Sequence, residues 1–306
     1  LAVYAPYAGH SFLVYDCSRC GCRFVNRRSD MFDEMHSQSG SPYDEHEARA
    51  ERAVHLLKML GPEALRRELV RTPKNAFVIE TIEARKDLVR LLEIGCSKGY
   101  LTAYFIARGL SVIGVDSSRR AVEDARRRFG DHFLVAGSGE LERLAPFDAI
   151  YHVGTIGCVD SPIEMTRWLL SLLRPGGVLV FNAPNVKACV QSGRLWVSTA
   201  PPDLITIFPP NFWCDHFAEW ADVQIDVQYE KGIRALKQCI RKVIGNGHKN
   251  VRSHRELIGH NCAVARKHSA SRFKSLLRSS ANLLPWHWFL PRVATEGGVH
   301  VLMNKR

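Results

Sequence analysis

The 306-residue chain carries 42 Lys and Arg against 31 Asp and Glu, and 46% of its residues are hydrophobic. This composition is typical of a globular protein and excludes fibrous and intrinsically disordered classes. The length suffices for one large α/β domain with additions, or for two domains. No apolar run reaches the roughly 18 residues that a bilayer-spanning helix needs. The first residues also lack the basic and apolar regions of a secretion signal.

Nine cysteines are scattered along the chain without regular spacing. An odd, irregular set argues against a disulfide framework and fits a reducing compartment, so we expect a cytoplasmic protein.

Positive charge is concentrated at the C-terminal end. Residues 230–306 hold 16 Lys and Arg and 3 Asp and Glu, whereas the other 229 residues hold 26 and 28. Such an excess favours an anionic partner for this segment in particular.

The first 87 residues divide into two parts. Residues 1–45 are rich in Cys, His, Ser and aromatic residues and show no long hydrophobic period, so we expect an irregular segment. Across residues 46–87 apolar residues recur at helical spacing, which predicts a helical N-terminal extension.

From residue 88 to residue 229 strand and helix patterns alternate. We expect strands at 88–95, 111–116, 132–137, 147–154 and 174–184, helices between them, and a further helix and sixth strand within 213–229. This alternation predicts parallel strands joined by right-handed crossovers, which is a doubly wound α/β sheet.

A last apolar run lies at residues 298–306 and is the expected seventh strand. Residues 230–297 separate it from the sixth, and we interpret them as a basic helical insertion or lid, with amphipathic helices near 232–245 and 271–284.

The stretch LLEIGCSKGYLT, residues 91–102, passes from a strand to a helix through a glycine-containing turn. A ligand can approach the backbone amides there. The dinucleotide pattern G-x-G-x-x-G is absent, because Ser97 stands where its second glycine would be. Asp116 ends the next strand, where a carboxylate can accept both hydroxyls of a ribose. The alternative is that Asp116 only caps the helix that starts at Ser117.

Three stretches together carry a family resemblance: LEIGCSKGYLT, VIGVDSSRRAVEDAR and LLRPGGVLVFNAPN. Over Leu88 to Tyr229 the sequence resembles the class I S-adenosylmethionine-dependent methyltransferases. The resemblance implies a Rossmann-like, mostly parallel seven-stranded sheet and S-adenosylmethionine as cofactor. The cofactor-binding positions that it implies are Glu93, Gly95, Cys96, Ser97, Gly99, Asp116, Ser117, Ser138 and Gly139.

Within this set, Glu93 is expected to order the loop and Asp116 to hold the ribose. The family's acidic residue on the adenine side would fall near Ser138 and is missing. The backbone of residues 137–139, or Glu140, would then make that contact.

The expected reaction site lies after the strand at 147–154. Many small-molecule relatives have Glu and His just past this strand, and Gly157 and Cys158 occupy those places here. We therefore expect His152, at the strand's carboxyl end, to line the methyl-transfer site as base or orienter. The alternative is a histidine packed against the cofactor or the core.

The segment that follows the fifth strand resembles the acceptor-pocket region of the same small-molecule relatives. It implies Asn182, Trp196, Asp203 and Phe208 as substrate-binding positions, although the aromatic residues could equally be packing. No N/D-P-P-Y/F motif follows the fourth strand, which counts against methylation of nucleic-acid bases.

The pair Cys17 and Cys20, followed by Cys22, resembles one knuckle of the N-terminal zinc ribbon that relatives carry. Tetrahedral zinc needs four ligands, and only the second of the ribbon's two Cys-x-x-Cys knuckles is present. His10 or Cys22 would have to complete the site, or the missing pair lies upstream of Leu1. Cys17 and Cys20 are candidate zinc ligands, and a metal-free remnant is the expected state.

We expect an enzyme that methylates a small or carrier-borne acceptor at oxygen, the acceptor bearing phosphate if the basic segment contacts it. Two alternatives stay open. One is an RNA-modifying or RNA-binding protein that uses the basic C-terminal region. The other is a non-catalytic methyltransferase-like partner protein, and the basic helices could also meet a membrane surface.

Overall fold

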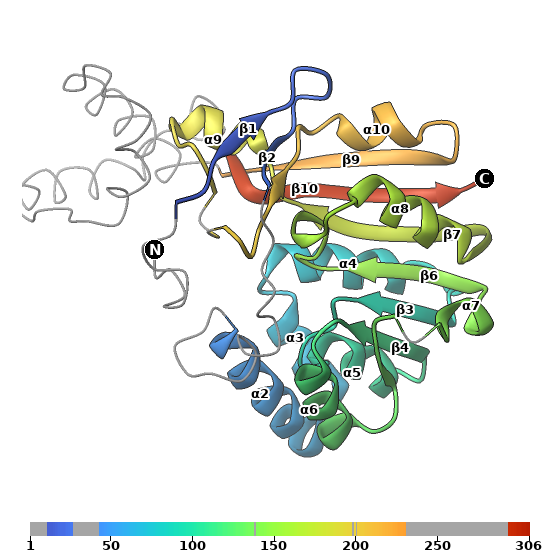
Figure 1. Ribbon diagram of the computed structural model, residues 1–306. Coiled ribbons are helices and arrows are strands. Elements are labelled where there is room, and N and C mark those ends of the chain that lie inside the picture. Colours follow the sequence, from blue (N-terminus) through green and yellow to red (C-terminus); the bar gives the residue numbers. More distant parts are fainter. Residues whose placement is uncertain (1–10, 27–42, 138, 198, 200, 231–292) are drawn as a thin grey trace, which may run out of the picture.

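Figure 1 shows the computed structural model of the chain, which describes residues 11–26, 43–137, 139–197, 199, 201–230 and 293–306. Nearly all of the predicted basic insertion, and also Ser138, lie outside the described residues.

A seven-stranded sheet forms the centre of the fold. Its strands are β3 (Arg90–Ile94), β4 (Ser111–Asp116), β5 (Phe133–Val135), β6 (Phe147–His152), β7 (Leu173–Ala183), β9 (Ala221–Glu230) and β10 (Val293–Lys305). They are ordered β5-β4-β3-β6-β7-β10-β9. Strands β3 to β7 pair in parallel, and β10 is antiparallel to both of its neighbours. The predicted seven-stranded, mostly parallel sheet is confirmed.

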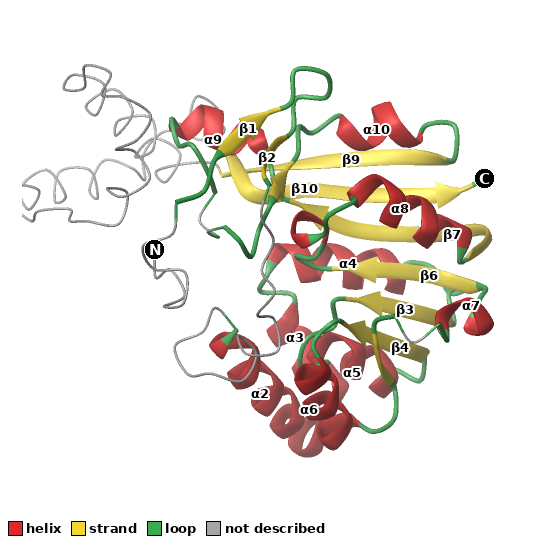
Figure 2. Cartoon of the chain, in the orientation of Figure 1, coloured by secondary structure: helices red, strands yellow, loops and turns green. Residues whose placement is uncertain are grey.

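Helices cover both faces of this sheet (Figure 2). They are α2 (Asp44–Leu60), α3 (Pro62–Leu69), α4 (Pro73–Glu83), α5 (Tyr100–Ala107), α6 (Arg119–Phe129), α7 (Leu141–Leu144), α8 (Pro162–Ser171), α9 (Val186–Ser192) and α10 (Phe212–Phe217). A short 3₁₀ helix, η2, spans Ile156–Cys158.

Alternation along the strands sends side chains to two separate cores. Leu91 and Val180 pack with residues of α2 to α5 on one face, whereas Leu92 and Phe181 pack with residues of α8 and α10 on the other. This is why the parallel strands are nearly continuous apolar runs in the sequence.

The strand-to-helix turns carry the local signals that the sequence predicts. Ser118 caps α6, its Oγ accepting a hydrogen bond of 3.2 Å from the Ala121 amide. Gly109, with φ +84°, follows α5, and Gly130, with φ +91°, follows α6. Both helices therefore stop where a left-handed residue is available.

The N-terminal segment differs from the expected irregular structure. Residues Val14–Asp16 (β1) and Arg23–Val25 (β2) form an antiparallel hairpin, and β2 pairs with Thr206–Ile207 (β8). The turn between β1 and β2 is closed by the Gly21 amide, which donates to the Cys17 carbonyl at 2.9 Å. Strands of three residues are too short to show a hydrophobic period, so the sequence could not reveal them.

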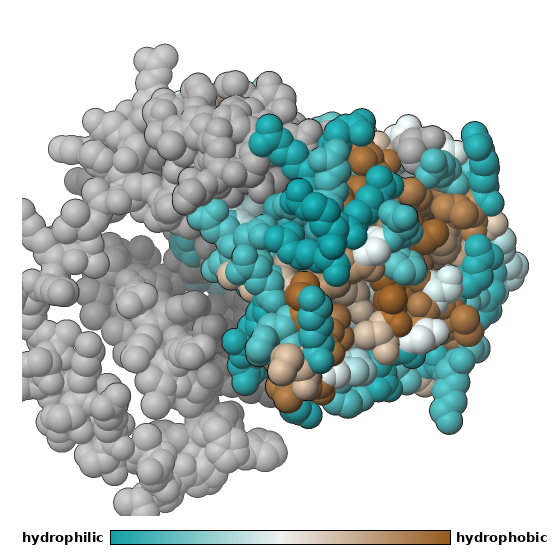
Figure 3. Space-filling model, turned by 90° about the horizontal axis from the view of Figure 1, so that it is seen from below, coloured by the Kyte–Doolittle hydropathy of each residue, from teal (hydrophilic) through white to brown (hydrophobic). Residues whose placement is uncertain are grey.

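Seen from below, the described surface is largely hydrophilic, with apolar patches between polar side chains (Figure 3). Within the described part of the chain, every helix is too short or too polar to cross a lipid bilayer.

Candidate functional site

A cavity of about 820 Å³ opens at the carboxyl ends of β3, β4, β6 and β7. This is the edge where open α/β sheets bind their ligands, and the volume is that of a small-molecule site. The cavity is lined by Tyr43, His46, Lys74, Ile94, Gly95, Ser97, Val115, Asp116, Ser117, Ala136, Gly137, Gly139, Leu141, Glu142, Val153, Gly154, Thr155, Cys158, Val159, Met165, Trp168, Asn182, Pro184, Val197, Thr199, Asp203 and Leu204.

The glycine loop, residues 95–99, follows β3 and lines the cavity with Gly95 and Ser97. Gly95 has φ +73°, and a Cβ atom placed on it would lie 2.2 Å from Oγ1 of Thr155. The amides of Gly95 and Cys96 both donate to the Val115 carbonyl, at 2.7 and 3.0 Å. Ser97 has φ +49°, unusual for a residue with a side chain. The loop is therefore a fixed turn, and residue 95 presents only backbone atoms to the cavity.

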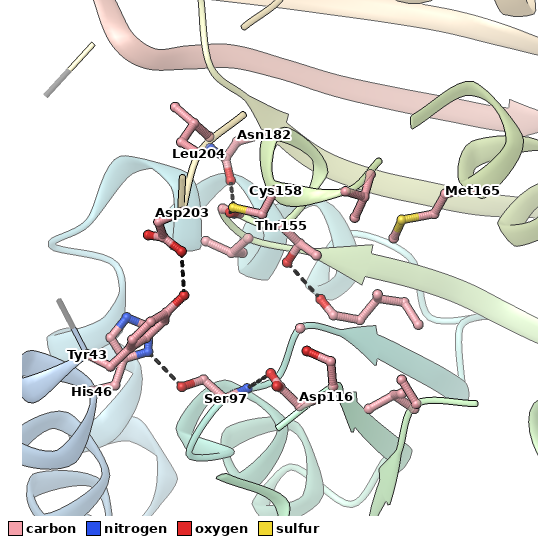
Figure 4. Close-up of a pocket in the computed structure, with 18 of the residues that line it drawn as sticks. Tyr43, His46, Ser97, Asp116, Thr155, Cys158, Met165, Asn182, Asp203 and Leu204 are labelled. Carbon is pink, nitrogen blue, oxygen red and sulfur yellow. Dashed lines mark hydrogen bonds between the residues drawn. The ribbon is translucent and has the colours of Figure 1, made fainter. Parts of the chain in front are cut away.

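Asp116 connects this loop to the next helix. Its Oδ2 accepts from the Ser97 amide at 2.8 Å, and its Oδ1 accepts from the Ser118 amide at 2.9 Å. The carboxylate lines the cavity while 8% of the residue is exposed (Figure 4). Ser118 provides the side-chain cap of α6, and Asp116 also holds the Ser97 amide, so capping this helix is not the only role of Asp116.

Glu93 lies behind the loop and outside the cavity lining. It is buried in β3, where its Oε2 accepts hydrogen bonds from Thr102 of α5 and from the Tyr151 hydroxyl of β6, the latter at 3.2 Å. Burial raises the pKa of Glu93 to about 8. The side chain thus ties α5 and β6 to the strand that carries the glycine loop.

Glu93 gives a testable pH dependence. A carboxyl group whose pKa rises on folding adds stability below its unfolded pKa, and this contribution is lost as the pH rises toward the folded pKa. We expect the Glu93 contribution to the free energy of unfolding to decline from about pH 5 to about pH 8. In Glu93→Gln the hydroxyls of Thr102 and Tyr151 can still donate to the amide oxygen, but this decline disappears.

Urea unfolding of both proteins across that range measures the difference. Glu51→Gln, at an exposed position of α2, is the control and should keep the wild-type profile. Parallel stability curves for wild type and Glu93→Gln would contradict the prediction.

Two glycines and side chains of α7 and α8 line one end of the cavity. Gly137 and Gly139 lie there with Leu141 of α7, and Glu142 accepts a hydrogen bond of 3.1 Å from Nε1 of Trp168. The predicted Glu140 is not among the lining residues, and Glu142, two positions on, is. Sequence reasoning missed it because a single-turn helix shows no period from which to infer the inward side chain.

The other end is covered by the start of α2. The Tyr43 hydroxyl donates to Oδ1 of Asp203 at 2.8 Å, and Nδ1 of His46 lies at hydrogen-bond distance, 2.9 Å, from Oγ of Ser97 (Figure 4). Burial raises the pKa of Asp203. The segment before the sheet therefore reaches over the glycine loop and contacts residues far along the chain.

His152 ends β6, as expected, but it does not line the cavity. Its side chain is fully buried, stacks on Phe181 with ring centroids 4.5 Å apart, and neither ring nitrogen has a hydrogen-bond partner. Burial lowers its pKa to about 3. The side chain points into the core beside Phe181. The next residue, Val153, lines the cavity, whereas His152 does not. This position does not fit a base in contact with an acceptor.

The remaining predicted residues divide between cavity and core. Gly95, Ser97, Asp116, Ser117, Gly139, Asn182 and Asp203 line the cavity. Cys96, Gly99, Trp196 and Phe208 do not line it, although each is close in sequence to a residue that does. Phe208 is fully buried against Phe212 and Trp213. Gly99, with φ +77°, is required by packing, because an added Cβ would lie 2.6 Å from Phe133.

Gly157 has a packing reason of its own. A Cβ atom there would lie 2.3 Å from Cδ1 of Leu204 and 2.9 Å from the Thr206 carbonyl oxygen. The Gly157 carbonyl also accepts from the Ile205 amide at 2.8 Å. Gly157 therefore makes a close contact with the segment leading into β8.

The described cysteines are all free thiols. Hydrogen bonds from Cys20 lower the pKa of the Cys17 thiol. Among the described residues no group of three or more His, Cys, Asp or Glu side chains is arranged to hold a metal ion.

The sheet order, the glycine loop after β3 and the acid after β4 together define the fold of class I S-adenosylmethionine-dependent methyltransferases. The family model described as "Methyltransferase domain" matches residues 45–220, more than half of the chain. The chain belongs to this family, as the sequence resemblance predicts, and the matched region includes α2 to α4.

Three curated relatives show the range of similar proteins. The chain is 28% identical over 134 residues to a malonyl-[acyl-carrier protein] O-methyltransferase of Enterobacter lignolyticus, covering 42% of this chain and 51% of that protein. It is 30% identical over 104 residues to a ubiquinone biosynthesis O-methyltransferase of Caulobacter, covering 32% and 41%. It is 34% identical over 100 residues to a tRNA U34 carboxymethyltransferase of Shewanella pealeana, covering 30% of each. The chain thus spans about half or less of these relatives.

Proposed function

We propose that this protein binds S-adenosylmethionine in the cavity and methylates a small or carrier-borne acceptor at an oxygen atom. The observation that carries the proposal is the meeting of the Asp116 carboxylate with the bare backbone of the glycine loop at one cavity edge. When bound, S-adenosylmethionine supplies an electrophilic methyl group on a positively charged sulfur.

The residues present fit this cofactor. Gly95 and Ser97 line the cavity, and only glycine fits at residue 95, because an added Cβ would collide with Thr155 at 2.2 Å, so the loop can keep its backbone close to a ligand. Asp116 would hold the ribose hydroxyls, and residues 95–97 the amino-acid part. Leu141 and Glu142, beside the Gly137–Gly139 turn, would enclose the base.

Methyl transfer is an in-line displacement, and positioning supplies much of its rate. A hydroxyl acceptor also needs a group that takes its proton. His46 and Asp203 are the proton acceptors that we assign to this task, since both line the cavity and His152 does not. Burial raises the pKa of Asp203, which makes its carboxylate a stronger base.

The choice of oxygen and of a small or carrier-borne acceptor draws on the similar proteins. Two of them carry O-methyltransferase in their names, one of which acts on an acyl-carrier protein. The partly closed cavity, with Tyr43 bound to Asp203 across its edge, also favours an acceptor that enters as a single small group.

The test is transfer of tritiated methyl groups from S-adenosylmethionine. The full chain is incubated with a pool of small phenols and carboxylic acids, with acyl-carrier proteins, and with bulk RNA. Incorporation into one of the first two pools, stable to mild base if an ether and labile if an ester, supports the proposal. Binding of the cofactor without transfer to any pool would favour the non-catalytic alternative.

RNA is a second candidate acceptor. The similarity to a tRNA-modifying enzyme and the charge of residues 230–306 both favour it. Base-stable incorporation into the RNA pool, with binding that weakens steeply as salt is raised, would support this candidate and overturn the first.

A further inference from the structure

A lysine without a counter-ion lies in the cavity. Lys74 is the second residue of α4 and, among the described residues that line the cavity, the only Lys or Arg. Its Nζ is 3.7 Å from the point that a Cβ on Gly154 would occupy. Gly154 is the second residue after β6, and its amide donates to Oδ1 of Asn182 in β7 at 2.9 Å. Lys74 therefore faces the β6–β7 side of the cavity, on the other side of β3 from Asp116.

The carboxylates of the cavity have partners other than Lys74. Asp116 accepts two backbone amides, Asp203 accepts the Tyr43 hydroxyl, and Glu142 accepts the Trp168 indole. Burial lowers the Lys74 pKa, and the charge of Arg49 lowers it further, whereas Cys158 and Glu45 act in the opposite direction. No hydrogen bond or ion pair joins Lys74 to another described residue.

Lys98 shows how this fold treats a buried lysine that has a structural role. It is 3% exposed and pairs with Asp124 and, at 3.2 Å, with Glu47. Burying a charge is costly unless it is paired, so a half-buried lysine in a cavity without a carboxylate partner indicates a site that an anion completes.

The N-terminus of α4 adds to the positive potential at Lys74. Thr72 precedes α4, Pro73 begins it, and its first turn has no acidic residue. The partial positive charge of this 11-residue helix therefore adds to that of the ammonium, and the first turn of α4 has no acidic side chain to offset it.

We propose that Lys74 binds an anionic group, a carboxylate or a phosphate, of the methyl acceptor. The inference rests on the proposed function and narrows it to acceptors that carry such a group close to the methylated atom. The cofactor also has a carboxylate, and the experiment must separate the two sources.

The first arm concerns the cofactor. S-adenosylhomocysteine and 5′-methylthioadenosine, which lacks the amino acid, are titrated calorimetrically into the full chain and into Lys74→Met. We expect each nucleoside to bind both proteins with affinities within about threefold. A tenfold loss for S-adenosylhomocysteine alone would show that Lys74 holds the cofactor's carboxylate, and would overturn the inference while leaving the proposed function intact.

The second arm concerns the acceptor. Inorganic phosphate and acetate are titrated against the melting temperature of the S-adenosylhomocysteine-saturated protein, with sodium chloride at matched ionic strength as reference. We expect the half-saturating concentration to rise about tenfold or more in Lys74→Met and to be largely retained in Lys74→Arg. Lys86→Met removes the same charge at an exposed position beyond the other end of α4, and should behave as wild type.

Equal anion responses of wild type and Lys74→Met would overturn the inference. If Lys74→Met does not fold, Lys74→Gln takes its place in both arms. Absence of S-adenosylhomocysteine binding to the wild-type chain would instead overturn the proposed function, and the inference with it.

Discussion

Replacing Asp116 by asparagine is expected to weaken S-adenosylhomocysteine binding about 100-fold. Both oxygens of the carboxylate accept backbone amides, from Ser97 at 2.8 Å and from Ser118 at 2.9 Å. An asparagine must place an N–H₂ group against one of these donors, and it also loses the charge that would hold two ribose hydroxyls. Hydrogen bonds to charged groups are worth about 1.5–3 kcal/mol, and every 1.4 kcal/mol is about tenfold in affinity.

Isothermal titration of wild type and Asp116→Asn measures this effect. Asp148 provides a matched control, because its Oδ2 accepts the amides of Val89 and Arg90, both at 2.8 Å, at the opposite end of the sheet. Asp148→Asn should lose stability and keep its affinity for the nucleoside. An Asp116→Asn protein that is folded and binds like wild type would remove Asp116 from the site.

Replacing Gly95 by alanine is expected to reduce nucleoside binding by a similar factor and to lower stability. The residue has φ +73°, and its Cβ would lie 2.2 Å from Oγ1 and 3.0 Å from Cγ2 of Thr155. Thr155 is held in place by the hydrogen bond of 3.1 Å that its hydroxyl donates to the Ile94 carbonyl. Either this bond breaks or the loop shifts away from β6. A shift moves the Ser97 amide that Asp116 holds.

Gly109→Ala separates backbone strain from collision. Gly109 has φ +84°, comparable to Gly95, but nothing lies within 4 Å of the added Cβ, and the residue is outside the cavity. It should lose about 1–2 kcal/mol of stability from the left-handed conformation and bind the nucleoside normally. Thermal unfolding and titration of both variants test the comparison. Equal binding losses in the two would mean that instability, and not the geometry of the loop, weakens the site.

The sheet and half of the cavity could be predicted because their signals are local. A parallel strand buried on both faces is a short apolar run, and the glycine loop and Asp116 directly follow such runs at β3 and β4. The left-handed conformations at Gly95 and Gly99 likewise require particular residues at particular positions.

His152 shows where this kind of reasoning stops. Its place at the end of β6 locates it at the correct edge of the sheet, but not on a face. The side chain faces the core that contains Phe181, and pattern alone could not decide this in a strand that is apolar on both faces.

The covering residues could not be found from the sequence. Tyr43 lies in the segment that shows no hydrophobic period, whereas His46 and Lys74 lie in the predicted helical extension. All three line the cavity beside residues that are distant in sequence. The Tyr43–Asp203 contact spans 160 residues. Only the packing of α2 to α4 against the sheet brings these side chains to the cavity.

The central claim is that this cavity is an S-adenosylmethionine site, and a crystal structure of the full chain with S-adenosylhomocysteine tests it most directly. We predict the ribose hydroxyls within hydrogen-bond distance of the Asp116 carboxylate, and the amino-acid part along residues 95–97. The base should lie between Gly137 and Gly139 on one side and Glu142 on the other. A nucleoside bound elsewhere, or none at saturating concentration, would contradict the account.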